Sequence, residues 1–282
     1  MAVRLSRKIQ DRGNPELDPL RLGKASPKAM RTEVIPAKGV LPGGILVSRV
    51  RIYDTVSPDG QRGGTPHIHL ASDEMYYCLS GQGAVEIIDW EGFKRYSIAP
   101  GEVMSFTPGT IHRAINLRRD LTILVIMQNK GLPEQGDVAI CFPRTTLSSR
   151  AAYEKRMSVF TDEDAFRRRD LGVEGFLDLK STFERSLKAG RELLDRFYRR
   201  ALENTRKQLA DWRQVIETGP AVEVQRSRDI ITTLESGSIV SLRRGRGKAV
   251  CSNSRTSFGY CGYVESYHPG KVFNHIPEGL SY

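Results

Sequence analysis

Short apolar runs separated by turn residues extend from Gly44 to about Met127, and this alternation constrains the fold of the chain more than any other feature. The runs, rich in β-branched and aromatic residues, are ILVSRVRIYD, EMYYCLS, AVEIID, VMSFT and LTILVIM; the turns between them include SPDG, SGQG, DWEG, APGE and PGT. Strands that recur roughly every 8–12 residues with Gly and Pro between them are typical of a β-sandwich or β-barrel. We therefore predict a mainly β domain over residues 43–145, with one more short strand at Val138–Phe142.

The segments on either side of this domain have a different character. Residues 1–42 are rich in Pro, Gly and charged residues and show little periodicity, so we expect an extended N-terminal arm. In the C-terminal region, residues 146–282, apolar residues recur at three- and four-residue steps between about 174 and 218. This period predicts one long amphipathic helix, broken near Gly190 and ending before Gly219-Pro220. The last 60 residues have no clear period and are compatible with two or three short strands.

The composition of the 282-residue chain narrows the classes of function. Its formal net charge is +10, but the basic residues are dispersed, are not interleaved with aromatic residues and show no helix-turn-helix or zinc-finger spacing. We therefore expect a basic surface that favours small anionic ligands, and no nucleic-acid partner. No run approaches the ~20 apolar residues of a membrane span. No apolar segment follows the basic N-terminus, so we expect a cytoplasmic protein. The four scattered cysteines are expected to be reduced thiols.

Three of the five histidines fall in two short segments that are otherwise typical of strands. In an extended strand His67 and His69 point to the same face, with Cα atoms about 6.6 Å apart, so that both imidazoles can reach one ion. After a short turn, Glu74 can begin the next strand facing the same interior. The Pro108-Gly109 turn directs a third imidazole, that of His112, inward. These four side chains predict a site for one divalent metal ion, with Fe, Mn, Ni, Co and Zn all suited to imidazole and carboxylate ligands.

The same strand geometry indicates which residues near these four can reach the metal or its substrate. Tyr76 lies two residues along the strand from the glutamate, close enough to orient a substrate or donate a proton from beside the metal, although filling the barrel is the simpler role. Asn116 is too distant for a ligand and is expected to fix backbone. Arg113 points to the opposite face of its strand, and we expect it at the surface. His268 and His275 lie in a Pro- and Gly-containing tail without a third ligand at a known spacing, so we expect no metal there.

The two segments resemble the two sequence motifs of the cupin superfamily. The first motif is HxH, four residues, Glu, six residues, Gly, and it is matched by His67, His69, Glu74 and Gly81. The second places a His eleven residues after a Gly and an Asn four residues after that His, and it is matched by Gly101, His112 and Asn116. Two positions depart from the pattern: Gln61 stands where the first motif opens with Gly, and Thr107 stands where the second has Pro.

The resemblance covers roughly residues 44–128. It implies a double-stranded β-helix barrel in which the three histidines and the glutamate bind a metal, and it makes enzymatic chemistry at that metal the first expectation. Four protein ligands on a six-coordinate ion leave two positions open. One carboxylate against a dication leaves about one net positive charge, which favours an anionic substrate. We therefore expect an Fe(II)-dependent dioxygenase that acts on a small organic metabolite.

Two other functions stay open at this point. One is a redox-neutral isomerase, decarboxylase or lyase in the same barrel, using the metal as a Lewis acid. The other is a sensor or binding module for a small ligand, without catalysis. By analogy with other cupins we expect a homodimer, with the N-terminal arm and the long helix as candidate contacts.

Overall fold

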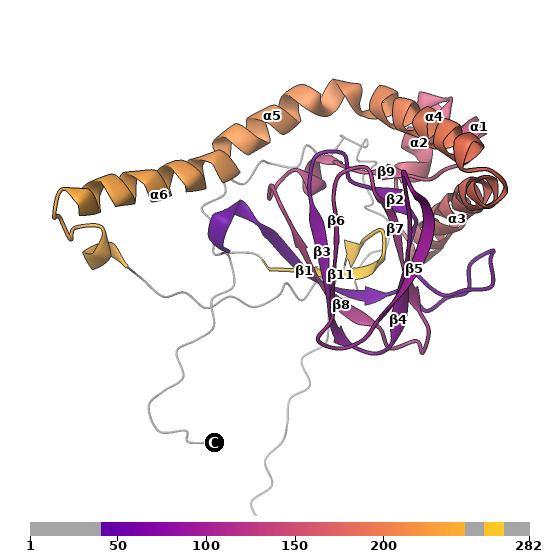
Figure 1. The fold of residues 1–282 in the computed structure, drawn as a ribbon, viewed down its shortest axis with the longest axis horizontal. Helices are drawn as coiled ribbons and strands as arrows, with labels where there is room; N and C mark the ends of the chain where they lie inside the picture. The colour runs from indigo at the N-terminus through magenta and orange to yellow at the C-terminus, as the bar shows by residue number, and fades with distance from the viewer. Residues whose placement is uncertain (1–40, 246–256, 268–282) are drawn as a thin grey trace, which may run out of the picture. The chain divides into compact units, whose positions relative to one another are not determined.

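The structure is a computed structural model that describes residues 41–245 and 257–267 (Figure 1). All described residues belong to one compact unit. The N-terminal arm predicted over residues 1–42 therefore lies outside the described residues except for its last two. His268 and His275 also lie outside them.

Two antiparallel sheets form the β domain (Figure 1), and their inner faces share one apolar core. In the six-stranded sheet the order is β10 (Ser257–Phe258), β11 (Gly262–Ser266), β1 (Leu46–Ile52), β8 (Thr122–Met127), β3 (Glu74–Ser80) and β6 (Val103–Phe106). In the five-stranded sheet the order is β5 (Gly92–Ile98), β4 (Gly83–Asp89), β7 (Ile111–Asn116), β2 (His67–Ile68) and β9 (Ala139–Ile140). The predicted mainly β fold is confirmed, and the short strand expected at Val138–Phe142 is β9.

Strands β4 and β7 are buried along almost their whole length, whereas buried and exposed residues alternate in β3. The inner face of β4 contributes Val85 and Ile87 to the core between the sheets. Its outer face contributes Ile88 to a second core, which contains Phe176 and Phe197 from the helices. Because a strand covered on both sides needs an almost continuous apolar run, the sequence AVEIID lacks the alternation of a half-exposed strand.

The helical C-terminal region is confirmed, although its boundaries differ from the prediction. Its helices are α1 (Arg144–Leu147), α2 (Arg150–Met157), α3 (Asp162–Arg185), α4 (Leu187–Thr205), α5 (Leu209–Thr218) and α6 (Pro220–Glu235). Short 3-10 helices lie at Pro42–Gly44, Pro133–Gln135, Arg206–Gln208 and Leu242–Arg244. The single helix expected over about 174–218 is thus three helices, and the first begins at Asp162.

The break expected near Gly190 is at Ser186 instead. Ser186 has extended backbone, and its hydroxyl accepts a hydrogen bond from the Ala189 N–H, so it ends α3 and caps α4. Gly190 lies inside α4, where a Cβ would approach the Phe183 ring to 2.4 Å. Glycine is therefore required at this position by close helix packing and does not mark a break.

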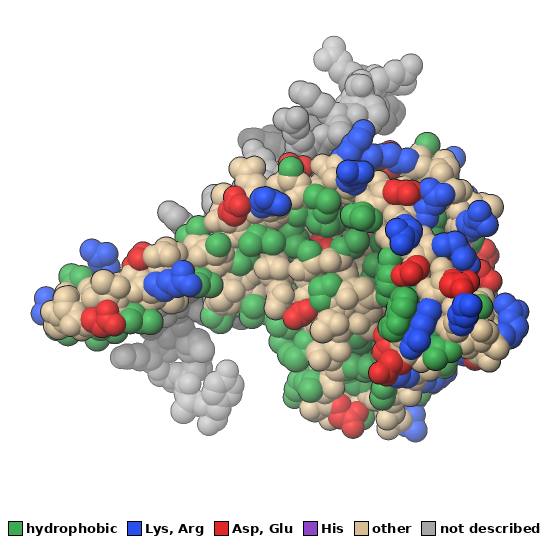
Figure 2. Space-filling model, turned by 45° about the horizontal axis from the view of Figure 1, so that its top comes forward, with side chains coloured by type: hydrophobic (Ala, Val, Ile, Leu, Met, Phe, Trp, Pro, Cys, Tyr) green, Lys and Arg blue, Asp and Glu red, His purple; other side chains and the backbone are tan. Residues whose placement is uncertain are grey.

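The predicted end before Gly219-Pro220 is correct for α5, but Pro220 also begins α6, where a first-turn proline needs no N–H partner. No residue of α6 is buried. Hydrophobic side chains on α5 and α6 reach the surface (Figure 2), among them Val222, Val224 and Ile231, each more than half exposed. Among the described residues, no helix combines the length and the apolar character needed to cross a bilayer.

The C-terminal part of the described chain returns to the barrel as a hairpin made of β10 and β11. Strand β11 pairs with β1 in antiparallel register, for example Val50 with Val264 and Ile52 with Gly262. A Cβ at Gly262 would lie 1.9 Å from the Arg51 carbonyl oxygen, so only glycine permits this approach. The ambiguous tail thus contributes an integral strand of the larger sheet.

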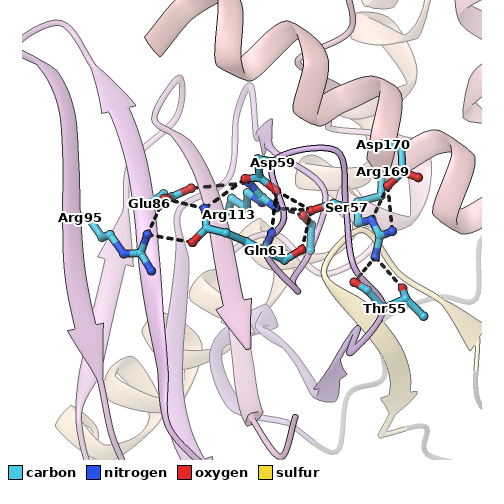
Figure 3. Close-up of polar contacts among 10 residues, drawn as sticks. Thr55, Ser57, Asp59, Gln61, Glu86, Arg95, Arg113, Arg169 and Asp170 are labelled. Carbon is cyan, nitrogen blue, oxygen red and sulfur yellow. Dashed lines mark hydrogen bonds and ion pairs between the residues drawn. The ribbon is translucent and has the colours of Figure 1, made fainter. Parts of the chain in front are cut away.

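Arg113 is completely buried, and its expected surface position is wrong (Figure 3). It does point away from His112, but residues 53–64 fold over this outer face of β7. Its Nη1 donates to Asp59 Oδ2 at 2.5 Å, and its Nη2 donates to Ser57 Oγ at 2.8 Å. Glu86 Oε2 lies 3.6 Å from the same Nη1. Although burial alone would raise the pKa of the Asp59 carboxyl, the hydrogen bond and charge of Arg113 hold it well below the ordinary value. The strand alternation gave the correct face for Arg113, but not the loop that covers it.

Candidate metal centre

Four side chains, from β2 and the residue after its end, from β3 and from β7, meet at one point inside the barrel. One ligand atom of each of His67, His69, Glu74 and His112 lies within 4.8 Å of the corresponding atoms of the other three. His67 in β2 lies directly opposite His112 in β7, and Glu74 opens β3. All four residues are at most 5% exposed. The structure therefore brings together the whole predicted ligand set.

Hydrogen bonds to backbone carbonyls fix the orientation of all three imidazoles. Nδ1 lies 2.7 Å from the Thr65 oxygen in His67, 2.5 Å from the Asp137 oxygen in His69 and 3.0 Å from the Thr110 oxygen in His112. A carbonyl oxygen only accepts hydrogen bonds, so each Nδ1 must carry the proton. In a neutral ring, Nε2 is then left with a lone pair that faces the shared centre.

The unpaired buried acceptor atoms and the carboxylate of this cluster favour a bound cation. Glu74 Oε2 lies 2.7 Å from His112 Nε2 and 3.4 Å from His69 Nε2, yet both Glu74 Oε2 and His112 Nε2 are buried without a hydrogen-bond partner. Burial lowers the pKa of His67 and of His69, which favours neutral rings. Burial alone would raise the pKa of Glu74, but the imidazoles of His112 and His69 lower it to about 2. A charged carboxylate beside three imidazoles whose Nε2 atoms face one point fits one divalent metal ion.

Residues 54–127, which contain all four side chains, match the family model described as the cupin domain. This part of the chain is a cupin domain. Together with the two antiparallel sheets, the match confirms the predicted double-stranded β-helix barrel.

Solved structures with similarity to this chain include enzymes and a protein of unknown function. One is TDP-fucose-3,4-ketoisomerase from Campylobacter jejuni, with 18% identity over 30% of this chain and 58% of that chain and a TM-score of 0.25. Another is DMSP lyase from Ruegeria pomeroyi, with 20% identity over 30% of this chain and 38% of that chain and a TM-score of 0.24. A third is an uncharacterized protein with a double-stranded β-helix domain from Klebsiella pneumoniae, with 14% identity over 30% of this chain and 64% of that chain and a TM-score of 0.23. In each case this chain spans less than two thirds of the other chain's length. The comparison with curated proteins gives no match.

Tyr76 lies beside the metal centre of the cupin domain, as the strand alternation predicted. Its ring centroid is 5.7 Å from that of His112, and its hydroxyl is 3.0 Å from the Sγ of Cys261. Burial raises the pKa of the Tyr76 phenol well above its ordinary value, so the hydroxyl is protonated. A protonated hydroxyl at this position can donate a hydrogen bond. Its part in catalysis stays a prediction.

Asn116 fixes backbone, as expected from its distance to the centre. Its Nδ2 donates to the Ile52 carbonyl, and its Oδ1 accepts from the Leu121 N–H. The second motif of the cupin domain therefore ends on a residue that ties β7 to the end of β1 and to the turn before β8.

The β10–β11 hairpin places Tyr260 and Cys261 against the cupin domain, and the sequence patterns indicated neither residue. The Tyr260 ring centroid lies 5.2 Å from that of His67, and the Tyr260 carbonyl accepts from the Thr65 N–H at 2.9 Å. The only local signal for this turn is the pair of glycines at Gly259 and Gly262. Because β11 pairs with a strand more than two hundred residues earlier in the sequence, no local pattern shows where the turn lies.

Asp137 was also missed, and it positions the turn that follows His69. Its carbonyl accepts from His69 Nδ1, while its Oδ1 accepts from the N–H groups of Leu70 and Ala71 at 2.8 and 2.9 Å. The side chain is completely buried. Asp137 therefore holds both the imidazole and the backbone next to it.

We expect Asp137→Ala to weaken metal binding about tenfold, the low end of the effect of residues that orient a metal-binding histidine. The variant keeps the backbone carbonyl that binds His69, but it removes the carboxylate that holds the Leu70 and Ala71 N–H groups of the adjoining turn. Competition for Zn(II) with a chelating dye measures the change. Asp73→Ala is the matched control, since Asp73 lies in the same turn, is partly exposed and has no side-chain partner among the described residues. Equal affinities in the two variants would contradict the positioning role.

Proposed function

We propose that the protein is a metal-dependent enzyme that binds one Fe(II) per chain and acts as a dioxygenase on a small organic metabolite. The observation that carries the proposal is the buried set of three imidazoles and one carboxylate. Four such ligands would leave two positions of a six-coordinate ion for substrate and dioxygen. When bound, a redox-active ion of this kind supplies the electron transfer that dioxygen needs to react with an organic molecule.

The residues of the chain provide a dry and oriented surrounding for that chemistry. Phe106 stacks on His112, with ring centroids 4.2 Å apart and planes at 10°, and Tyr76 packs against Phe106 at 4.9 Å. These rings exclude water from one side of the centre. The Tyr76 hydroxyl can donate a hydrogen bond to a substrate oxygen and so hold a developing negative charge.

The same ligand set also suits Mn, Ni, Co and Zn, so the second candidate is a redox-neutral isomerase, decarboxylase or lyase. A protein that binds a small ligand without catalysis is the third. All three candidates need the same buried centre and differ in whether dioxygen is consumed and whether product forms.

Metal analysis and oxygen uptake separate the candidates. We expect protein purified without chelator to contain about one iron per chain, given the ligand set. Protein loaded with Fe(II) should consume oxygen in the presence of a small organic acid or phenol, and protein loaded with Zn(II) should not. Product formation under argon with Zn(II) or Mn(II) would contradict the dioxygenase proposal and favour the redox-neutral enzyme. Ligand binding with no product under either gas would favour the binding module.

A further inference from the structure

Arg168 differs from the other buried arginines of the described chain. Arg113 is paired with Asp59, and Arg169, only 1% exposed, is paired with Asp170 and donates to backbone and side chain of the 53–64 loop (Figure 3). Arg168 is 5% exposed and forms no ion pair with any residue that the structure describes. Its Nη2 donates to the Gly259 carbonyl at 2.6 Å, and its Nε is buried without a partner.

A buried guanidinium without a counter-charge is unfavourable for folding, since the charge loses its hydration and gains no anion in return. One carbonyl oxygen satisfies one of the five N–H donors and none of the charge. Arg168 therefore has a free donor and an unbalanced positive charge in the interior of the protein.

The position of Arg168 connects it to the metal centre. Its guanidinium lies over the Tyr260 ring, 4.7 Å from the ring centroid, and the same centroid lies 5.2 Å from that of the His67 ring. One turn further along α3, Gly172 packs against Thr65, two residues before His67 in the chain, with a Cβ position 3.1 Å from Thr65 Cγ2. The hydroxyl of Thr65 is also buried without a partner. Two unpartnered polar groups thus lie one aromatic ring away from the ligands.

We propose that Arg168 binds the carboxylate of the substrate, so that the enzyme acts on a small organic acid. The inference rests on the proposed function, because Arg168 lies one aromatic ring away from the metal ligands. The planar guanidinium matches the two oxygens of a carboxylate, and one negative charge balances the one buried positive charge. A phosphate dianion would require further donors, and Arg168 is the lone unpaired cation beside Tyr260 among the described residues.

The test compares acids with their neutral amides, using acetate against acetamide and benzoate against benzamide as probes. Titration calorimetry on the metal-free full chain isolates the contribution of Arg168, since a bound metal itself attracts anions. We expect the parent chain to prefer one of the acids over its amide by about tenfold or more, as a charge-assisted contact in a buried site predicts. Arg168→Gln should reduce that preference to about twofold or less. Arg167→Gln is the matched control, because Arg167 is the preceding residue of α3, is exposed and pairs with Glu163, and it should keep the full preference.

Equal affinity for acid and amide in the parent chain would overturn the inference, and so would an unchanged preference in Arg168→Gln. A merely structural role in holding Gly259 would weaken acid and amide alike and leave their ratio unchanged. If Arg168→Gln does not fold, Arg168→Lys replaces it: the preference must fall while staying above one, and a preference as large as in the parent overturns the inference. Metal content of the same preparations is measured in parallel. Failure to take up metal would contradict the proposed function, whereas metal uptake without acid preference would contradict only the role of Arg168.

Discussion

His112→Ala is expected to reduce bound metal from about one ion per chain to less than about a tenth, because the variant removes one of three imidazoles and leaves a cavity in a completely buried ligand set. His112 also lies 2.7 Å from Glu74, so its loss removes the closest neighbour of the carboxylate. Metal analysis after dialysis against metal-free buffer measures the change, and circular dichroism reports whether the barrel is intact.

His275→Ala serves as the control for His112→Ala. His275 lies outside the described residues, and its sequence context offers no third ligand, so its replacement should leave the metal content unchanged. Retention of one ion per chain in His112→Ala would show that the cluster is not the metal site. Loss of metal in both variants would point to a ligand set that includes the tail.

Arg113→Met should lower the free energy of unfolding by about 3–5 kcal/mol, because removal of one partner of a buried ion pair leaves the other charge uncompensated. Here Asp59, whose side chain is only 8% exposed, loses its cation, whereas Glu86 keeps its ion pair with Arg95. Urea unfolding followed by circular dichroism measures the effect. The replacement keeps most of the side-chain volume, so the change reports the lost charge and hydrogen bonds more than a cavity.

Arg49→Met is the matched control for Arg113→Met. Arg49 also lies on a strand and pairs with a carboxylate, Glu265, but its side chain is 45% exposed. An exposed pair of this kind contributes less than about 1 kcal/mol. Similar destabilisation in both variants would contradict the special role of the Arg113 network.

The barrel and the metal centre follow from local patterns, and for that reason they were accessible from the sequence. A two-residue alternation places His67 and His69 on one face, and turns of fixed length bring Glu74 and His112 to the same interior. The helices were predicted less well because their buried face includes charged residues. Arg168 and Arg169 resemble solvent-facing residues in the sequence, so the apolar period first becomes visible at Phe176, almost four turns after the true start of α3 at Asp162.

Contacts between distant segments account for the rest of what the sequence did not show. Alternation places Arg113 on the outer face of β7, but only the path of the loop containing Asp59 shows that this face is covered. Similarly, nothing around Tyr260 indicates that its hairpin joins β1. These features depend on contacts between segments that are distant in the sequence, and local sequence patterns do not predict such contacts.

The C-terminal hairpin makes the enclosed centre dependent on an intact chain. A fragment ending at residue 245 would contain His67, His69, Glu74 and His112, but it would lack Tyr260 and the strand beside β1. Ligand supply and ligand enclosure are thus encoded almost two hundred residues apart. Premature termination or proteolytic cleavage between them would leave a metal-binding barrel open to any solute, whereas the uncut polypeptide keeps its centre shielded.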